Sequence, residues 1–140
     1  MKTVVVDTDA LIALVNKDDV LALDAVKTLE DLHASEVKLV YPSTTIVEAI
    51  TTFQRKLSNS GLAGDMAQML RDGQFNIVPV DQNILEQAET LFKPKGSKQN
   101  TMFDAVVAAV AKTTNADAIF SFDKWYEKVG LRLATSLFKA

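Results

Sequence analysis

Short apolar segments rich in β-branched residues alternate along this chain with longer segments of helical periodicity, and this alternation constrains the fold more than any other feature. The expected strands cover residues 4–6, 38–41, 75–80 and 118–121, with a weaker fifth at 131–133. The expected helices cover residues 10–15, 20–32, 45–57, 62–70, 82–92 and 102–113. Strands that alternate with helices of this length usually pair in parallel. The order therefore predicts an α/β fold, a three-layer α/β/α sandwich with a mostly parallel central sheet of four to five strands.

Size and composition predict a single domain that spans residues 1–140. The chain has 140 residues, of which 48% are hydrophobic and 24% are charged, and these values exclude disordered and fibrous classes. Asp7 and Asp9 interrupt the first apolar run, and no apolar run approaches the roughly 18 residues that cross a bilayer. We therefore expect a cytoplasmic protein that does not associate with a membrane.

The residue types that are scarce limit the chemistry. The chain has no cysteine and one histidine, which excludes disulfides, thiolate catalysis and cysteine zinc sites. Any bound metal must therefore be held by oxygen atoms. The formal net charge of −3 does not fit a protein that grips nucleic acid through a wide basic surface. Any contact with nucleic acid is therefore expected to be local.

Acidic residues recur where the expected strands end. Asp7 follows the first strand, Asp123 follows the fourth, and Glu48 lies in about the first turn of the helix after the second. Asp104 opens the helix that precedes the fourth strand. Ligands of parallel sheets bind beyond the carboxyl ends of the strands, so these acids are expected to share one edge.

Each acid also has a simpler structural explanation. Asp7 is suited to cap the helix that opens at Ala10, and Asp123 to cap a short turn. The segments 45–48 and 101–104 fit the capping-box pattern, in which Thr is followed three residues later by an acid. Taken together, however, four converging carboxylates repel one another, which favours a cation among them. With oxygen ligands alone the cation would be Mg²⁺ or Mn²⁺, and phosphate-ester chemistry follows naturally.

The ordered acids resemble the PIN domain family, and in particular its VapC-type toxins. The matching features are the hydrophobic strand before Asp7 and Thr8, Glu48 after the second strand, Asp104-Ala105 at the start of an Ala/Val-rich helix, and the segment ADAIFSFD at 116–123. The order, the spacing and the chain length are all similar, and the match covers nearly the whole chain. The resemblance implies a PIN-like fold and a metal-dependent endoribonuclease.

The resemblance also implies roles for individual residues. Asp7, Glu48, Asp104 and Asp123 occupy the acidic positions of the family. Asp7, Asp104 and Asp123 would hold Mg²⁺ or Mn²⁺, while Glu48 would ligate the metal or orient the attacking water, leaving 5′-phosphate and 3′-hydroxyl ends. Secondary candidates are Thr8, Asp9 and Ser121. Asp9 departs from the family, where Ser or Asn is common, and its role stays open.

Partners follow from the same resemblance. RNA would be the substrate, and an antitoxin protein is expected to bind the toxin. The helices between residues 45 and 70 are candidates for the antitoxin groove or for a homodimer interface. Basic residues that are candidates for phosphate contacts are Arg55, Lys56, Lys93, Lys95, Lys98 and Lys124. For any one of them, a solvated surface cation is the simpler interpretation.

Two other classes of protein fit parts of the sequence. A strand followed by Asp-x-Asp also resembles the haloacid-dehalogenase-like phosphatases, in which Asp7 would be the nucleophile and Asp9 the acid and base. That class needs a terminal acidic pair that is missing here, and it gives Glu48 and Asp104 no role. The other class is a non-catalytic α/β binding module whose acids only cap helices.

Overall fold

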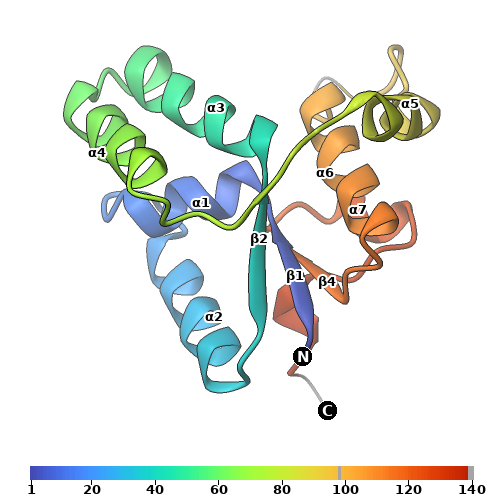
Figure 1. Ribbon diagram of the computed structural model, residues 1–140, viewed down its shortest axis with the longest axis horizontal. Coiled ribbons are helices and arrows are strands. Elements are labelled where there is room, and N and C mark those ends of the chain that lie inside the picture. The colour runs from blue at the N-terminus through green and yellow to red at the C-terminus, as the bar shows by residue number, and fades with distance from the viewer. Residues whose placement is uncertain (98, 139–140) are drawn as a thin grey trace.

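The computed structural model describes residues 1–97 and 99–138, which form a parallel sheet with helices on both faces (Figure 1). The strands are β1 (Thr3–Val6), β2 (Lys38–Pro42), β3 (Ile77–Val78) and β4 (Ala118–Phe120). The helices are α1 (Thr8–Val15), α2 (Ala22–Ala34), α3 (Ser43–Thr51), α4 (Ser60–Arg71), α5 (Gln82–Leu91), α6 (Met102–Thr113) and α7 (Trp125–Lys128), with a π-helix η1 (Thr52–Lys56) and a 3₁₀-helix η2 (Ala134–Ser136). The expected three-layer α/β/α fold is confirmed.

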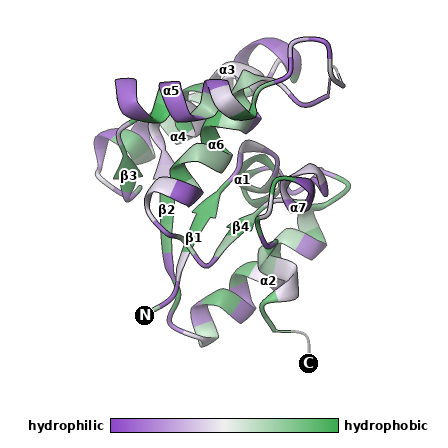
Figure 2. Ribbon diagram, turned by 90° about the vertical axis from the view of Figure 1, so that its right-hand side faces the viewer, coloured by the Kyte–Doolittle hydropathy of each residue, from purple (hydrophilic) through white to green (hydrophobic). Residues whose placement is uncertain are grey.

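The period-two pattern of β1 divides the core between the two faces of the sheet. Val4 and Val6 point to one face, where they pack with residues of α1 to α4, and Val5 points to the other face, against α5 and α6. All three valines are completely buried, as expected for a central parallel strand. Figure 2 shows the hydrophobic residues concentrated in the strands, while the outer helices carry both hydrophobic and hydrophilic residues.

The strand order creates the place where a ligand would bind. The sheet runs β3-β2-β1-β4 with every pair parallel, so the chain moves outward from β1 to β3 and then returns to the opposite side of β1. The reversal of direction lies between β1 and β4, where their carboxyl ends open a crevice. In Figure 1 this end of the sheet lies toward α3 and α6, and the N-terminus lies at the opposite end.

Two of the expected strands are shorter than the sequence suggested. The third strand forms pairs only at Ile77 and Val78, and the segment 131–133 contributes a single parallel bridge between Leu133 and Ile119. The sheet therefore has four strands in the described residues. Pro79, which has no amide hydrogen, follows β3 directly, and a strand at the sheet edge needs few pairing residues.

The second expected helix begins two residues later than the sequence suggested. It starts at Ala22, and the side chain of Asp19 accepts a hydrogen bond from Leu21 N–H in the turn before it. The buried residues of this helix are Ala22, Ala25, Thr28 and Leu32. Leu23 is apolar but 86% exposed, because the core-facing stripe follows the 22, 25, 28 and 32 spacing.

The third expected helix begins earlier than the sequence suggested. Pro42 ends β2 and is the N-cap residue, so α3 starts at Ser43 and the expected capping box of Thr45 and Glu48 does not form. Glu48 consequently lies in the second turn of α3. After Thr51 the helix continues as η1, with π-type hydrogen bonds. No helix within residues 1–97 and 99–138 is long and apolar enough to cross a membrane.

Candidate active site

Asp7 lies at the junction of β1 and α1, at the carboxyl end of the sheet. Its backbone N–H donates to the carbonyl oxygen of Phe120 at 3.0 Å, which extends the β1–β4 pairing to this residue. Its extended backbone makes it the N-cap of α1, and its Oδ1 accepts a hydrogen bond from Thr8 N–H at 2.8 Å. Only 4% of the residue is exposed. Asp7 thus caps α1, as expected, and is also buried at the place between β1 and β4 where the strand order reverses.

Ser121 links the acids of β1 and β4. Its hydroxyl is 2.9 Å from Asp7 Oδ2 and 3.2 Å from Asp9 Oδ2, and it accepts a hydrogen bond from Asp123 N–H at 3.0 Å. A hydroxyl has one proton and donates to one carboxylate at a time, and the shorter distance favours Asp7. Ser121 is almost completely buried, and its hydroxyl lies within hydrogen-bond distance of groups from Asp7, Asp9 and Asp123.

Asp9 connects α1 to the segment after β4. Its Oδ2 accepts a hydrogen bond from Phe122 N–H at 3.1 Å, and its Oδ1 lies 2.6 Å from Ala10 N. Both oxygens are therefore used by backbone groups of the protein. Asp9 therefore has a structural role next to the other acids, because it joins the start of α1 to the segment after β4.

Asp123 is held from two sides. Its Oδ1 accepts a hydrogen bond from Trp125 N–H at 2.9 Å, at the start of α7. Its Oδ2 accepts from the Asn100 side-chain amide at 2.8 Å. Asn100 comes from the loop before α6 and was not among the residues singled out in the sequence. Its polar loop offered only compositional information, and its contact with Asp123 depends on how that loop packs.

Asp104 lies in the first turn of α6 and forms the expected capping box with Thr101, whose N–H donates to Asp104 Oδ2 at 3.0 Å. The Tyr126 hydroxyl donates to Asp104 Oδ1 at 3.5 Å. Tyr126 is completely buried on α7. Nothing in the local sequence pattern around Tyr126 indicates a contact with acids far away in the chain.

Glu48 reaches the same edge from α3. The Thr8 hydroxyl donates a hydrogen bond to Glu48 Oε1, so the residue next to Asp7 fixes the position of this fifth acid. Thr8 is 8% exposed. The structure thus brings together the site residues expected from the sequence, Asp7, Thr8, Asp9, Glu48, Asp104, Ser121 and Asp123.

Burial, together with the charges of neighbouring acids, raises the pKa values of Asp7, Asp9, Glu48 and Asp104. Burial, and then the charges of Asp9 and Asp104, raise the pKa of Asp7 well above its ordinary range. Burial, together with the charges of neighbouring acids, raises the pKa of Asp104 to about 6. The pKa values of Asp9 and Glu48 are raised mainly by burial. The site therefore concentrates negative charge at a cost in free energy, which a cation would offset.

The chemical type of the candidate ligands fits a hard cation such as Mg²⁺ or Mn²⁺. All the candidate ligands are oxygen atoms, and for Asp7 and Asp104 both burial and the charges of neighbouring acids disfavour the charged state. In the part of the chain that the structure describes, however, no three acidic or histidine side chains are arranged to hold a metal ion as they stand. Mg²⁺ usually takes one or two carboxylates and keeps several waters, so a closed cage of protein ligands is not required.

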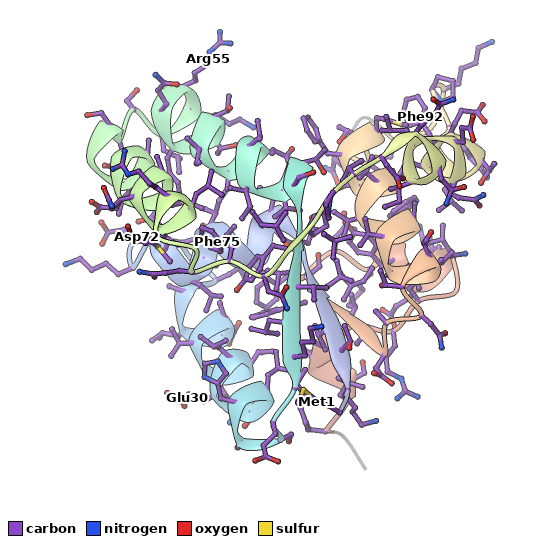
Figure 3. All side chains as sticks on the ribbon, viewed as in Figure 1. Met1, Glu30, Arg55, Asp72, Phe75 and Phe92 are labelled. Carbon is purple, nitrogen blue, oxygen red and sulfur yellow. The ribbon has the colours of Figure 1, made fainter. Side chains whose placement is uncertain are left out.

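The basic candidates fall into two groups. Arg55 and Lys56 lie on η1 and line a cavity that also includes Glu48, and Figure 3 shows the Arg55 side chain extending outward. Lys93, Lys95 and Lys124 are exposed, the first two on the loop after α5 and the third before α7. Lys98 lies outside the described residues.

The fold and the site define a small α/β protein with a parallel sheet and with a cluster of acids at the edge where the strand order reverses. The sequence matches the PIN domain family over residues 4–131, and the chain therefore belongs to that family. The expected family resemblance is confirmed. The phosphatase alternative loses its basis, since Glu48 and Asp104, to which it gave no role, both lie at the site.

Among solved structures, the chain is similar to VapC20 of Mycobacterium tuberculosis, described as a toxin that cleaves the Sarcin-Ricin loop. The TM-score is 0.73 at 21% sequence identity, and the match covers 91% of this chain and 95% of that chain. At this identity the likeness establishes the fold. No curated protein matches the sequence significantly.

Proposed function

We propose that this protein is a VapC-like toxin ribonuclease that hydrolyses RNA phosphodiester bonds with the help of Mg²⁺ or Mn²⁺. The observation that carries the proposal is the gathering of five acids, from four separate parts of a PIN domain, around Ser121 and Tyr126. The structural likeness to a toxin that cleaves RNA supports the same activity. A chain whose acids only capped helices would have no need to bring them together against their mutual repulsion.

Asp7, Asp104 and Asp123 are the residues that would hold the metal. Asp7 and Asp123 follow the two strands that flank the crevice, and Asp104 comes from the helix beside it. A bound Mg²⁺ or Mn²⁺ would act as a Lewis acid on the phosphate and lower the pKa of water. Ser121, Asn100 and Tyr126 hold the three carboxylates in position through the hydrogen bonds described above.

Glu48 is suited to orient the attacking water and to accept its proton. Burial raises its pKa, which makes its carboxylate a stronger base than an exposed glutamate, and Thr8 fixes one of its oxygens. The water oxygen then bonds to phosphorus as the bond to the 3′ oxygen breaks, and the leaving 3′ oxygen takes up a proton from solvent water. The products are a 5′-phosphate and a 3′-hydroxyl.

Partners of the proposed toxin follow from its class. We infer that an antitoxin protein binds the chain and that two copies form a homodimer, in a cytoplasmic setting. The helices α3 and α4 are the candidates for these contacts. Copurification with the product of the adjacent open reading frame would test the first point, and recovery of the active protein alone, tolerated by its host, would contradict a toxin role.

The decisive experiment is cleavage of end-labelled single-stranded and structured RNA in Mg²⁺ or Mn²⁺. We expect metal-dependent cleavage by the unmodified protein and its loss in Asp104→Asn and Glu48→Gln. The matched control is Asp81→Asn, because Asp81 also lies at a helix N-terminus, where it accepts a hydrogen bond from Ile84 N–H, but is not among the clustered acids.

A phosphomonoester substrate run in parallel separates the alternatives. Phosphate release that survives Asp104→Asn, without RNA cleavage, would contradict the nuclease proposal and favour Asp7 as a nucleophile. No activity on either substrate, with no Mn²⁺ binding by calorimetry, would favour the non-catalytic binding module.

A further inference from the structure

A cavity of about 500 Å³ opens beside Glu48 and has no role in the chemistry proposed above. Its walls come from α3, η1 and the start of α6, and they include Val47, Arg55, Lys56 and Phe103. The volume lies within the range typical of pockets that hold small ligands. Because one wall contains Glu48, any group bound in the cavity lies next to the reacting phosphate of the proposed substrate.

Two large apolar side chains of this cavity face solvent. Val47 is 61% exposed and Phe103 is 43% exposed, and each directly precedes one of the site acids, Glu48 and Asp104. Leaving apolar surface in water is unfavourable by about 25 cal/mol per Å². The exposed aromatic ring is a flat surface on which a planar apolar group can stack.

The far end of the cavity is basic. Glu48, Thr52 and Arg55 all line the cavity, so they form one stripe along the continuous α3–η1 helix. At 1.5 Å per residue, Glu48 and Arg55 are about 10 Å apart along the axis. The stripe therefore runs from a site acid, past hydroxyl groups, to cations. Both Arg55 and Lys56 are exposed and able to contact a ligand.

We propose that this cavity holds the nucleotide next to the scissile phosphate, with its base stacked on Phe103 and its outer phosphate bound by Arg55 and Lys56. This inference rests on the proposed ribonuclease activity. Charge complementarity selects the occupant, because a nucleotide combines a planar aromatic base with an anionic phosphate, and the cavity combines an exposed aromatic ring with two cations. The hydroxyls of Thr51 and Thr52 are placed to bond the sugar or the base edge.

The first test is binding of a single-stranded RNA, measured by fluorescence anisotropy in the Asp104→Asn background so that the RNA stays intact. Loss of a stacked base typically weakens binding roughly 5- to 150-fold, and we expect Phe103→Ala to fall in this range. Phe103→Trp should keep the affinity, because it keeps a stacking ring. The matched control is Phe138→Ala, since Phe138 is 41% exposed and lies in a different cavity.

The second test concerns the phosphate. Affinity is measured at several salt concentrations, and the slope of log K against log salt concentration is compared. For Arg55→Gln this slope should become shallower by about 0.7, as expected for the loss of one phosphate contact to a single strand. Arg71→Gln is the control, because Arg71 is exposed on α4 and outside the cavity. An unchanged slope for Arg55→Gln would overturn the assignment of the basic end.

The outcomes separate this inference from the activity on which it rests. If the unmodified protein cleaves RNA and Phe103→Ala binds RNA as tightly as its parent, the cavity is not a nucleotide site and the ribonuclease proposal stands. If Phe103→Ala instead changes the oligomeric state in sedimentation and leaves RNA affinity intact, the cavity belongs to an interface between copies. If the unmodified protein neither binds nor cleaves RNA, both proposals fail.

Discussion

Replacing Asp104 by asparagine should make the folded protein more stable at neutral pH while abolishing its activity. The carboxylate of Asp104 is partly buried among other acids, and its pKa is raised to about 6, first by burial and then by the charges of Asp123, Glu48 and Asp9. Asparagine is neutral and keeps an oxygen that can accept the Thr101 hydrogen bond of the capping box. The change therefore removes repulsion and preserves the local helix start.

The magnitude follows from the pKa of Asp104. A rise from the ordinary value of 3.8 to about 6 corresponds to at most about 3 kcal/mol, because one pKa unit equals about 1.36 kcal/mol. The side chain is partly exposed, and water screens the repulsion, so we expect about 1–2 kcal/mol. For a chain of this size that gain corresponds to an increase in Tm of about 3–8 °C.

The effect should depend on pH with a defined sign. Between about pH 4 and 6 the folded state binds more protons at Asp104 than the unfolded state, so the free energy of unfolding falls as pH rises through this range. Asp104→Asn lacks this proton and should gain stability over the unmodified protein only as pH rises, with the full gain above about pH 7.

Thermal and urea unfolding in EDTA, at about pH 4.5 and about pH 7.5, would measure the effect. Asp81→Asn is the control and should change stability by less than about 1 kcal/mol, because asparagine caps helices nearly as well as aspartate. A lower Tm for Asp104→Asn at neutral pH, or the same gain at both pH values, would refute the reasoning from charge repulsion.

Further predictions concern the groups around the acids. Ser121→Ala should lower the free energy of unfolding by about 2–3 kcal/mol, measured with urea, because it removes a hydrogen bond to a buried carboxylate and leaves Asp123 N–H without its partner. The control Ser43→Ala loses one hydrogen bond from Val80 N–H and should lower it by about 1 kcal/mol. Adding Mn²⁺ or Mg²⁺ at neutral pH should raise the Tm of the unmodified protein in a saturable way and raise that of Asp104→Asn much less, and equal increases would argue against a metal site at these acids. Tyr126→Phe keeps the buried ring and removes the hydroxyl that bonds Asp104, so metal affinity in calorimetry should fall about 10- to 100-fold while unfolding by urea changes little.

The sequence predicted the acids at the ends of strands well, because their position follows from local pattern. Asp7 comes directly after a run of buried residues, Asp123 follows another such run after one intervening residue, and parallel strands bring their carboxyl ends to one edge. The expected position of Glu48 in the helix was less accurate. Pro42 starts α3 at Ser43, and a capping pattern at 45–48 could not reveal that an earlier residue would begin the helix.

Contacts across long stretches of chain could not be predicted in the same way. The Ser121 hydroxyl and Asp7 are 114 positions apart, and Thr8 and Glu48 are 40 apart. No local periodicity encodes such pairs. They form because β1 pairs with both β2 and β4, and because α3 and α6 lie toward the same end of the sheet (Figure 1).

The sequence by itself determined the order of strands and helices, the oxygen-only chemistry available to the site and the four acids of the PIN pattern, because these properties depend on residue type and short spacing. Only the tertiary structure decided that Tyr126 and Asn100 would hold the acids, that Asp9 would bond the backbone after β4, and that Phe103 would share a cavity with Arg55. The physical reason is that burial and electrostatic coupling depend on which surfaces pack together, and that choice is made by the whole core at once.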